Sequence, residues 1–317
     1  MAVSYKLLDD PHVLLLNEAG GVNVWLALRN GAEHVTVVQQ NPQVVDLMQN
    51  ELARYNGNVF NRDDVTVVNA DPRVYLAHTD QHFDLIQLSG TQELTAGGGV
   101  RSLNENFLLT TEGIEEALNH LKDPGLLTAT RGIQTPPRDN VKLFATFVEA
   151  LEKTGLAHPG NHVARYRNYL AATTTVSPSP FLNKRCSQLR ELCKQQRLDI
   201  SWAPCRKTWS GEQINELPGP EGETYSYLHY ASNHILDEER ESFFHNWLYN
   251  VQPPTDEKPY FYNLFKWSSL DTFIDKYGKR WLQRLELGYV VLVLTIAEVI
   301  LIGGILILLP LRWLRSP

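Results

Sequence analysis

The stretch that decides the fold is residues 12–42, HVLLLNEAGGVNVWLALRNGAEHVTVVQQNP. Residues 12–16 are a short apolar run, and residues 22–30 have the spacing of a helix that Gly31 ends in the usual position after the last turn. Residues 35–38 are all β-branched, as is typical of a strand. A strand, a helix and a second strand joined by short turns form the unit from which parallel sheets are built, so this stretch predicts such a sheet.

The same alternation continues towards the C-terminus. Further helices are predicted at residues 42–55, 110–121 and 141–153, further strands at 65–68, 83–88, 126–130 and 171–176, and a turn at 122–125. Strands that alternate with helices of this length predict an α/β fold, a doubly wound Rossmann-like domain whose parallel sheet is covered on both faces. We assign residues 1–176 to this domain and residues 177–286 to a C-terminal extension. The extension has predicted helices at 181–197 and 238–249, a strand near 198–203 and a polar loop between about 208 and 223.

Residues 287–311 predict one transmembrane helix. Leu, Ile and Val dominate the segment, and they outweigh the cost of its only charged residue, Glu298. We expect Glu298 to face another helix or a polar cavity, or to be kept neutral. Basic residues are more numerous before the segment than after it: Lys276, Lys279, Arg280 and Arg284 precede it, and Arg312 and Arg315 follow it. This asymmetry predicts that the soluble part lies on the cytoplasmic side of the membrane.

Composition and charge argue against several functions. The net charge is −7 and the acidic residues are scattered, which leaves no basic face for nucleic acid. The three cysteines, Cys186, Cys193 and Cys205, match no zinc-binding spacing, so no metal site is predicted. Their odd number and the lack of a secretory signal at the N-terminus predict reduced thiols, in a cytosolic compartment, that serve packing.

Ligands of doubly wound sheets bind beyond the carboxyl ends of the strands, where turns of this chain meet. The first of these turns contains Asn17, Ala19, Gly20 and Gly21. Its glycines let the backbone approach a ligand closely, and the helix that follows presents free N–H groups. Asparagine, the residue at Asn17, tolerates positive φ better than most residues. The turn does not match the pattern G-x-G-x-x-G, which disfavours a nicotinamide enzyme.

The next three turns each supply one polar candidate. Gln39 follows the second strand, where a carboxylate is expected if the site grips a ribose through both hydroxyls. Asp71 follows the third strand, where it either accepts a hydrogen bond from an adenine amino group or caps the helix that begins at Pro72. Ser89 follows the fourth strand.

These pieces, in this order and at these intervals, resemble a known family. LLLNEAGGVNVWLALRNGAEHVTVVQQNP, VTVVNADPRVYL and FDLIQLSG look like the spermidine synthase branch of the class I S-adenosylmethionine-fold transferases. The resemblance is closer to the membrane-bound members, which carry segments similar to SLNENFLLT (residues 102–110) and PPTDEKPYFYNLFKW (residues 253–267). It covers about residues 12–311, nearly the whole chain.

The resemblance implies a domain that holds decarboxylated S-adenosylmethionine, or S-adenosylmethionine itself, as a co-substrate at the carboxyl edge of the sheet. By position it places the ligand's amino-acid end near Asn17, Ala19, Gly20 and Gly21, the ribose near Gln39 and the adenine near Asp71. The family usually has glycine at the positions of Asn17 and Ala19 and an acid at that of Gln39. Soluble spermidine synthases have an aspartate where Ser89 stands, which takes a proton from the attacking amine. Glu93, four residues on, is the candidate to replace it.

Three functions follow from this resemblance and its departures. The first is aminopropyl transfer from decarboxylated S-adenosylmethionine to a polyamine such as putrescine, at a membrane. The second is a methyltransferase that uses S-adenosylmethionine. The third is a catalytically degenerate domain that serves as a scaffold or regulatory part of a membrane complex, which the departures at Asn17, Ala19, Gln39 and Ser89 favour. Membrane-bound members usually have further spans, so the chain resembles a piece of a larger membrane protein, or a shortened relative with a partner subunit.

Two further groups of residues have open roles. Asp256 and Glu105 lie in the family-like segments and are either functional or structural, as helix caps or as partners of Lys258 and Arg101. The aromatic residues of segment 260–267 form either a cage for a cationic amine or, as such clusters more often do, part of the core or of an interfacial belt beside the membrane.

Overall fold

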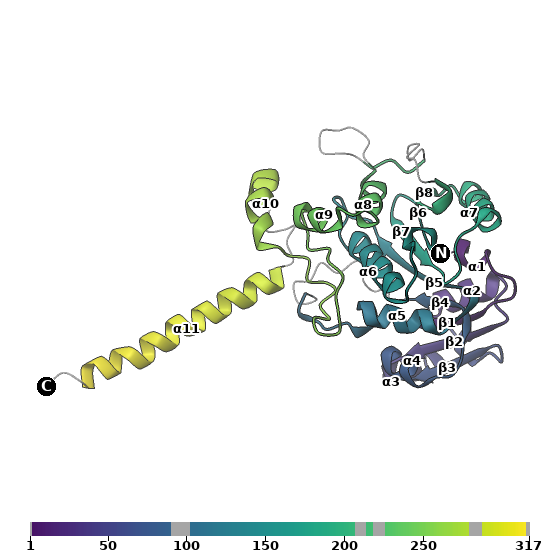
Figure 1. Cartoon of the computed structure of the whole chain (residues 1–317). Helices are drawn as coiled ribbons and strands as arrows, with labels where there is room; N and C mark the ends of the chain where they lie inside the picture. The colour runs from purple at the N-terminus through teal and green to yellow at the C-terminus, as the bar shows by residue number, and fades with distance from the viewer. Residues whose placement is uncertain (1, 90–101, 207–213, 218–225, 279–286, 315–317) are drawn as a thin grey trace.

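The computed structural model describes residues 2–89, 102–206, 214–217, 226–278 and 287–314 (Figure 1). In this part of the chain the strands form one eight-stranded sheet in the order β3-β2-β1-β4-β5-β7-β6-β8. In that order the strands are β3 (Val65–Asn69), β2 (His34–Gln39), β1 (His12–Leu16), β4 (Phe83–Leu88), β5 (Leu121–Gly132), β7 (Ala171–Val176), β6 (Val163–Arg167) and β8 (Asp199–Trp202). The predicted α/β fold with a Rossmann-like sheet is therefore confirmed.

The sheet is parallel in only one of its two halves. Strands β1 to β5 pair in parallel, as predicted. The pairs β5–β7, β7–β6 and β6–β8 are antiparallel, and β6 was not predicted at all. A short turn joins β6 to β7, in which the Asn168 side chain accepts hydrogen bonds from the N–H groups of Leu170 and Ala171; strands joined so closely pair antiparallel. Strand β8 lies in the segment assigned to the C-terminal extension, residues 177–286, yet it belongs to the same sheet.

All the predicted helices are present, with shifted ends. The described helices are α1 (Ala2–Tyr5), α2 (Val22–Arg29), α3 (Pro42–Gln49), α4 (Pro72–His78), α5 (Thr111–Asn119), α6 (Asp139–Lys153), α7 (Asn183–Gln195), α8 (Tyr227–Ile235), α9 (Arg240–Asn246), α10 (Leu270–Tyr277) and α11 (Leu287–Leu314). Helix α3 ends six residues before the predicted residue 55, because Asn50 leaves helical geometry and its side chain binds the Asp46 carboxylate. Residues 122–125, predicted as a turn, lie within β5. Much of the predicted loop at 208–223 falls outside the described residues.

Helices cover both faces of the sheet (Figure 1), and a hydrophobic cluster lies on each face. Successive side chains of a strand point to opposite faces, and β1 shows this directly. Leu14 and Leu16 pack in the cluster that includes α5 and α6, whereas Val13 and Leu15 pack in the cluster that includes α2 and α7. Burial on both faces explains why β1 is an apolar run with no polar alternation.

The cysteine prediction was wrong for two of the three residues. Cys186 of α7 forms a disulfide with Cys205, which lies in the short helix η6 (Pro204–Arg206). Cys193 is free and buried. Helix α7 and the strand β8 that follows it run in opposite directions, so η6 returns to the start of α7. This proximity depends on tertiary structure and is not visible in the spacing of the cysteines.

Helix α11 extends away from the α/β domain (Figure 1). Residues Val291–Arg312 are long and apolar enough to cross a membrane, with a mean hydropathy of 2.8, and their most apolar window is not buried against the rest of the chain. Glu298 is exposed on this helix, and a partner for it stays a prediction. The described part of the chain therefore has one candidate span, at its C-terminal end.

Candidate functional site

The turn between β1 and α2 has the backbone that a close approach to a ligand requires. Asn17 has a φ of 62° and Gly21 a φ of 81°, and asparagine is among the residues that tolerate such a φ best. Gly21 also lies against the short helix η1 (Val59–Asn61): a Cβ at Gly21 would lie 2.8 Å from Val59 Cγ1. Both its conformation and its surroundings therefore require glycine.

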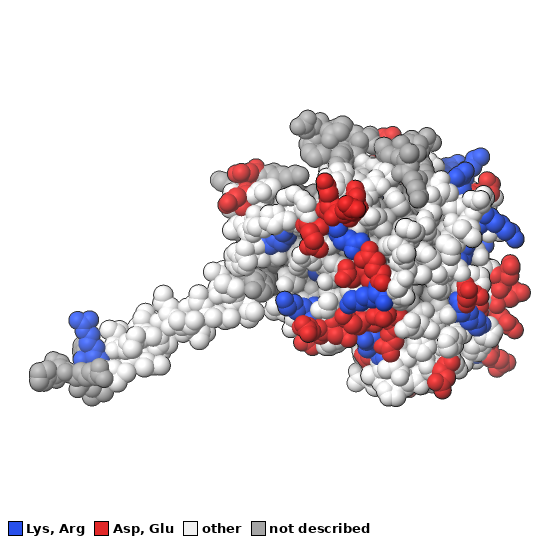
Figure 2. Space-filling view, viewed as in Figure 1, with Lys and Arg blue, Asp and Glu red and all other residues white. Residues whose placement is uncertain are grey.

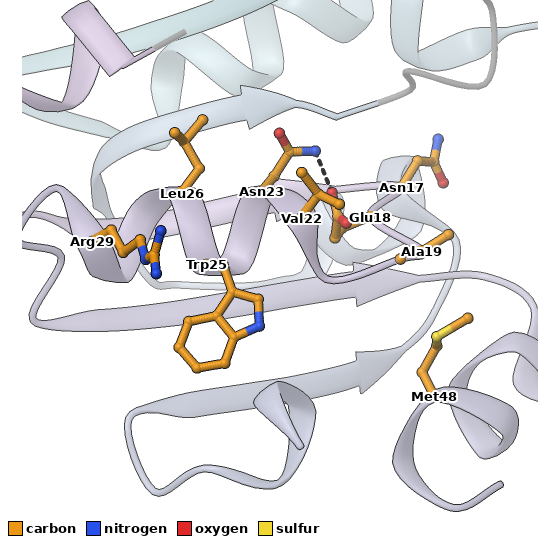
Figure 3. Close-up of a pocket in the computed structure, with 10 residues that line it drawn as sticks. Asn17, Glu18, Ala19, Val22, Asn23, Trp25, Leu26, Arg29 and Met48 are labelled. Atoms are coloured by element: carbon orange, nitrogen blue, oxygen red, sulfur yellow. Dashed lines mark hydrogen bonds between the residues drawn. The ribbon is translucent and has the colours of Figure 1, made fainter. Parts of the chain in front are cut away.

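A cavity of about 930 Å³ opens at this turn and continues along α2 (Figure 3). It is lined by Asn17, Glu18, Ala19, Gly20, Val22, Asn23, Trp25, Leu26, Arg29 and Met48. Its size and mainly apolar lining are typical of sites for small organic ligands. The sequence argument missed Trp25 and Met48. The Trp25 indole is fixed by a hydrogen bond from its Nε1 to the carbonyl of Asn56, at 2.8 Å.

Glu18 is a functional candidate to which the sequence argument gave no role. Its carboxylate is 4% exposed and accepts hydrogen bonds from the Gly21 N–H, at 2.8 Å, and from the Asn23 side-chain amide (Figure 3). Burial raises the pKa of Glu18, and these hydrogen bonds oppose the rise. A signal existed in the sequence, because an acid just before a helix is stabilised by the free N–H groups of the first turn.

Gln39 lies beside Glu18, with its side-chain amide engaged by backbone groups. Its Nε2 donates to the carbonyl of Glu18 at 2.8 Å, and its Oε1 accepts from the Asn41 N–H at 3.0 Å. Gln39 lines a small second cavity together with Glu18 and Ala19. The amide thus links the turns after β1 and β2, in the place where the resemblance implies a ribose.

Asp71 and Ser89 lie at the same edge of the sheet but are not among the residues that line these two cavities. Asp71 accepts hydrogen bonds from the N–H groups of Arg73 and Val74, at 2.8 and 3.2 Å, which confirms its role as the cap of α4. Its contact with adenine stays a prediction. Ser89 is buried, and its N–H donates to the carbonyl of Leu16. Its hydroxyl donates to the carbonyl of Gln87. Glu93 lies outside the described residues.

The acids of the two family-like segments hold the structure together. Asp256 accepts a hydrogen bond from the Thr110 hydroxyl at 2.6 Å and pairs with Arg73 at 3.1 Å, so it attaches segment 253–267 to α4 and the start of α5. Glu105 accepts a hydrogen bond from the Tyr260 hydroxyl at 3.3 Å. The structural alternative therefore describes both acids, although Asp256 pairs with Arg73 and not with Lys258.

Acidic and basic side chains are interspersed on the face seen in Figure 2. Lys153 pairs with Glu112 at 2.8 Å, and Arg240 pairs with Glu152 at 2.5 Å. Such pairing leaves no large field of one sign among the residues described on this face, in keeping with the mild net charge.

The aromatic segment belongs largely to the core. Phe261, Tyr262 and Phe265 are buried in the hydrophobic cluster that covers one face of the sheet, which confirms the core alternative for these three residues. Tyr260 and Trp267 are exposed.

A Rossmann-like sheet with a glycine turn after β1 is the fold implied by the resemblance to class I S-adenosylmethionine-fold transferases, and a ligand-sized cavity opens at that turn. In sequence, the chain is similar to polyamine aminopropyltransferase 2 of Hyperthermus butylicus, with 25% identity over 185 residues. The match covers 56% of this chain and 57% of the relative, so the chain spans a little over half of the length of this curated relative. No family model matches the chain.

Solved structures with a similar fold include the following two. Spermidine synthase from Thermotoga maritima is 15% identical, with a TM-score of 0.41 over 76% of this chain and 70% of that chain. Precorrin-6y C5,15-methyltransferase from Geobacter metallireducens is 17% identical, with a TM-score of 0.36 over 56% of this chain and 86% of that chain.

Proposed function

We propose that the chain is an aminopropyltransferase that binds decarboxylated S-adenosylmethionine at the turn after β1. The cavity of about 930 Å³ that opens at this turn carries the proposal. The sequence similarity to a polyamine aminopropyltransferase supports it.

In this reaction an amine of a polyamine such as putrescine attacks the carbon beside the sulfonium. A C–N bond forms, the C–S bond breaks with its electron pair going to sulfur, and methylthioadenosine leaves. The new secondary ammonium then loses a proton. The backbone at Gly20 and Gly21 holds and orients the donor, which accounts for much of the rate of such transfers. Ser89 has no carboxylate for the proton, and we assign that role to Glu93.

A non-catalytic scaffold is the second candidate. The observation that favours it is the engagement of Gln39 by the backbone, together with the hydroxyl of Ser89 in the place of an acid. A domain that keeps its fold without binding a donor would have these features.

Calorimetric titration of the full chain in detergent separates these functions. The ligands are decarboxylated S-adenosylmethionine, S-adenosylmethionine and methylthioadenosine. Micromolar binding of the decarboxylated form in preference to its parent supports aminopropyl transfer, and formation of spermidine from putrescine then completes the test. Preference for the parent supports methyl transfer. A folded chain that binds none of the three at millimolar concentration contradicts both transferase functions and leaves the scaffold.

We also propose that α11 attaches the domain of residues 1–176 and its extension, 177–286, to a membrane, with the soluble part on the cytoplasmic side. The heavier basic flank before the span supports this side. The disulfide between Cys186 and Cys205 favours an oxidising compartment instead. Lysis of cells directly into denaturant that contains a maleimide decides between them, because Cys186 is buried and is reached only after unfolding. Cytoplasmic placement predicts that both cysteines are modified, and protection of both until a reductant is added contradicts it.

A further inference from the structure

Another cavity, of about 560 Å³, lies at the edge of the sheet where the parallel strands begin, opposite the candidate site. Residues near the starts of β1, β2, β3 and β5, at the end of α4 and in the segment leading into β4 line this amino-edge cavity. Its described lining includes His12, His34, His82 and Lys122, and no acidic residue is part of it. The cavity is therefore rich in groups that carry or can acquire positive charge, in a chain whose net charge is −7.

The pairing of the strands brings these histidines together. His12 and His34 are the first residues of β1 and β2 and are paired in register, with their ring centres 6.2 Å apart. His82 directly precedes β4, which pairs with β1 on its other side, and its ring centre lies 5.7 Å from that of His120. Four imidazole rings therefore lie along one edge of the sheet.

Two carboxylates at this edge already have partners. Glu33 contacts the His12 ring at 3.1 Å. Asp84 accepts from the ammonium group of Lys122 at 2.8 Å and from the backbone N–H of His12 at 2.9 Å. The remaining acids of the adjoining turns are either paired with an arginine or exposed, and they are Asp64, Asp63 and Asp80. Among the described residues, the other two histidines of the lining, His34 and His82, therefore have no acidic partner.

His34 and His82 each engage one ring nitrogen and leave the other available. His34 bonds through Nε2 to the Thr66 hydroxyl at 2.9 Å, and His82 bonds through Nδ1 to the backbone carbonyl of Asp80 at 3.1 Å. The second nitrogen of each ring has no hydrogen-bond partner within the described part of the chain. Protonation turns both nitrogens of an imidazole into donors, so each ring can then donate to a bound anion.

The rest of the lining suits an organic molecule that carries an oxyanion. Val68, Phe83 and the ring of Tyr75 provide apolar surface, and three threonines provide hydroxyl groups. A volume of about 560 Å³ is in the range of small-molecule sites, and it is larger than an inorganic ion alone would fill. Histidine gains its charge between pH 5 and 8, and charged donors form stronger hydrogen bonds to phosphate than neutral donors do.

From this arrangement we infer that the amino-edge cavity is a second binding site, which takes a small organic phosphate when its histidines are protonated. His34, His82 and Lys122 hold the phosphate, and the apolar part of the lining contacts the organic group. Binding is coupled to proton uptake, so the ligand is held more tightly as pH falls towards 6. The inference is independent of the proposed function, because the two cavities share no lining residue.

The direction of the pH dependence tests the inference on the wild-type chain in non-ionic detergent. Phenyl phosphate gains its second negative charge near pH 6, so permanent cations alone would bind it more tightly at pH 8 than at pH 6. Protonated histidines reverse this order. We expect calorimetry to show about tenfold tighter binding at pH 6 than at pH 8, with uptake of protons. Equal or tighter binding at pH 8 would overturn the inference.

Variants locate the site. His34→Gln combined with His82→Gln removes both charges and keeps polar side chains, and it is expected to weaken binding at pH 6 at least tenfold, by about 1.4 kcal/mol or more. His78→Gln is the control, because the exposed His78 bonds to the Val74 carbonyl of its own helix and is not part of the lining. Unchanged binding in the double variant would overturn the inference, and His82→Gln alone replaces it if the double variant does not fold. Inorganic phosphate is expected to bind several-fold more weakly than phenyl phosphate. Equal affinities would mean an adventitious ion only.

Discussion

The turn after β1 and the end of β4 are neighbours at one edge of the sheet, yet they differ in chemistry. At the turn, Gly21 keeps the required backbone and Glu18 adds a buried carboxylate that is hydrogen-bonded within the turn. At the end of β4, Ser89 stands where a soluble relative would have an acid, and its N–H continues the ladder to β1 by donating to the carbonyl of Leu16. Under the proposed function, the difference teaches that the part of the edge proposed to bind the donor keeps its backbone, whereas the part that would accept a proton lacks the expected acid.

The largest effect is expected from Gly21→Ala. Alanine would have to adopt the positive φ of this position, which L-residues avoid, and its Cβ would lie 2.8 Å from Val59 Cγ1. We therefore expect the free energy of unfolding to fall by about 2–4 kcal/mol and ligand binding to be lost. Gly155→Ala is a matched control, because Gly155 has a φ of 85° with nothing within 4 Å of its added Cβ, and about 1–2 kcal/mol is expected there. Urea unfolding measures both. Equal losses would mean that the contact with Val59 contributes nothing.

Ser89→Asp tests the other region of this comparison, the end of β4. If Glu93 does not serve as the proton acceptor, the variant supplies one and is expected to raise kcat for spermidine formation by about a hundredfold, the low end of what a positioned base contributes. Ser89→Asn has nearly the same size and no basic carboxylate, and it is the control. An equal response of the two variants would show that the acid at this position is not limiting.

Much of the fold could be predicted because local pattern and global structure agree in β1 to β4. The apolar run of β1, the Asn41 cap of α3 and the helix that ends before Gly31 are all local signals, and each is present. Strand β6 is different. Its residues Arg165 and Arg167 are buried, although arginine is almost always placed at the surface. The guanidinium of Arg165 donates to the carbonyl of Asn140 at 2.8 Å and stacks 4.0 Å from the Phe144 ring centre. These contacts come from distant parts of the chain, so no local pattern indicates a strand there.

The candidate site was predicted less completely than the fold. The motif order located the turn, but not the side of it on which the cavity opens. Trp25 of α2 and Met48 of α3 line the same cavity, which is a tertiary fact that no local pattern indicates. Glu18 was overlooked because comparison with the family directs attention to positions where an expected glycine or acid is missing.

Glu18 also predicts a pH dependence of stability. Burial raises its pKa above the ordinary value of 4.5, so the folded chain binds this proton more tightly than the unfolded chain. Stability from this group is therefore full at low pH and falls as pH rises from the unfolded to the folded pKa. Glu18→Gln is expected to be more stable than wild type by roughly 1 kcal/mol at pH 7 and equal to it near pH 3. Thermal unfolding at both pH values measures this, and a variant less stable at pH 7 would show that the ionised carboxylate stabilises the turn.

The smallest effect is expected from Asp71→Ala, which separates capping from ligand contact at the third turn. Loss of the hydrogen bonds to the N–H groups of Arg73 and Val74 is expected to lower the free energy of unfolding by about 1 kcal/mol. Asn41→Ala is the matched control, because Asn41 caps α3 by accepting from the Gln43 N–H at 2.9 Å. If Asp71 only caps α4, the two variants lose similar stability and both keep the wild-type affinity for methylthioadenosine. A fall in that affinity of about tenfold in Asp71→Ala alone would instead assign the adenine contact to Asp71, because a lost hydrogen bond to a charged group is worth about 1.5–3 kcal/mol.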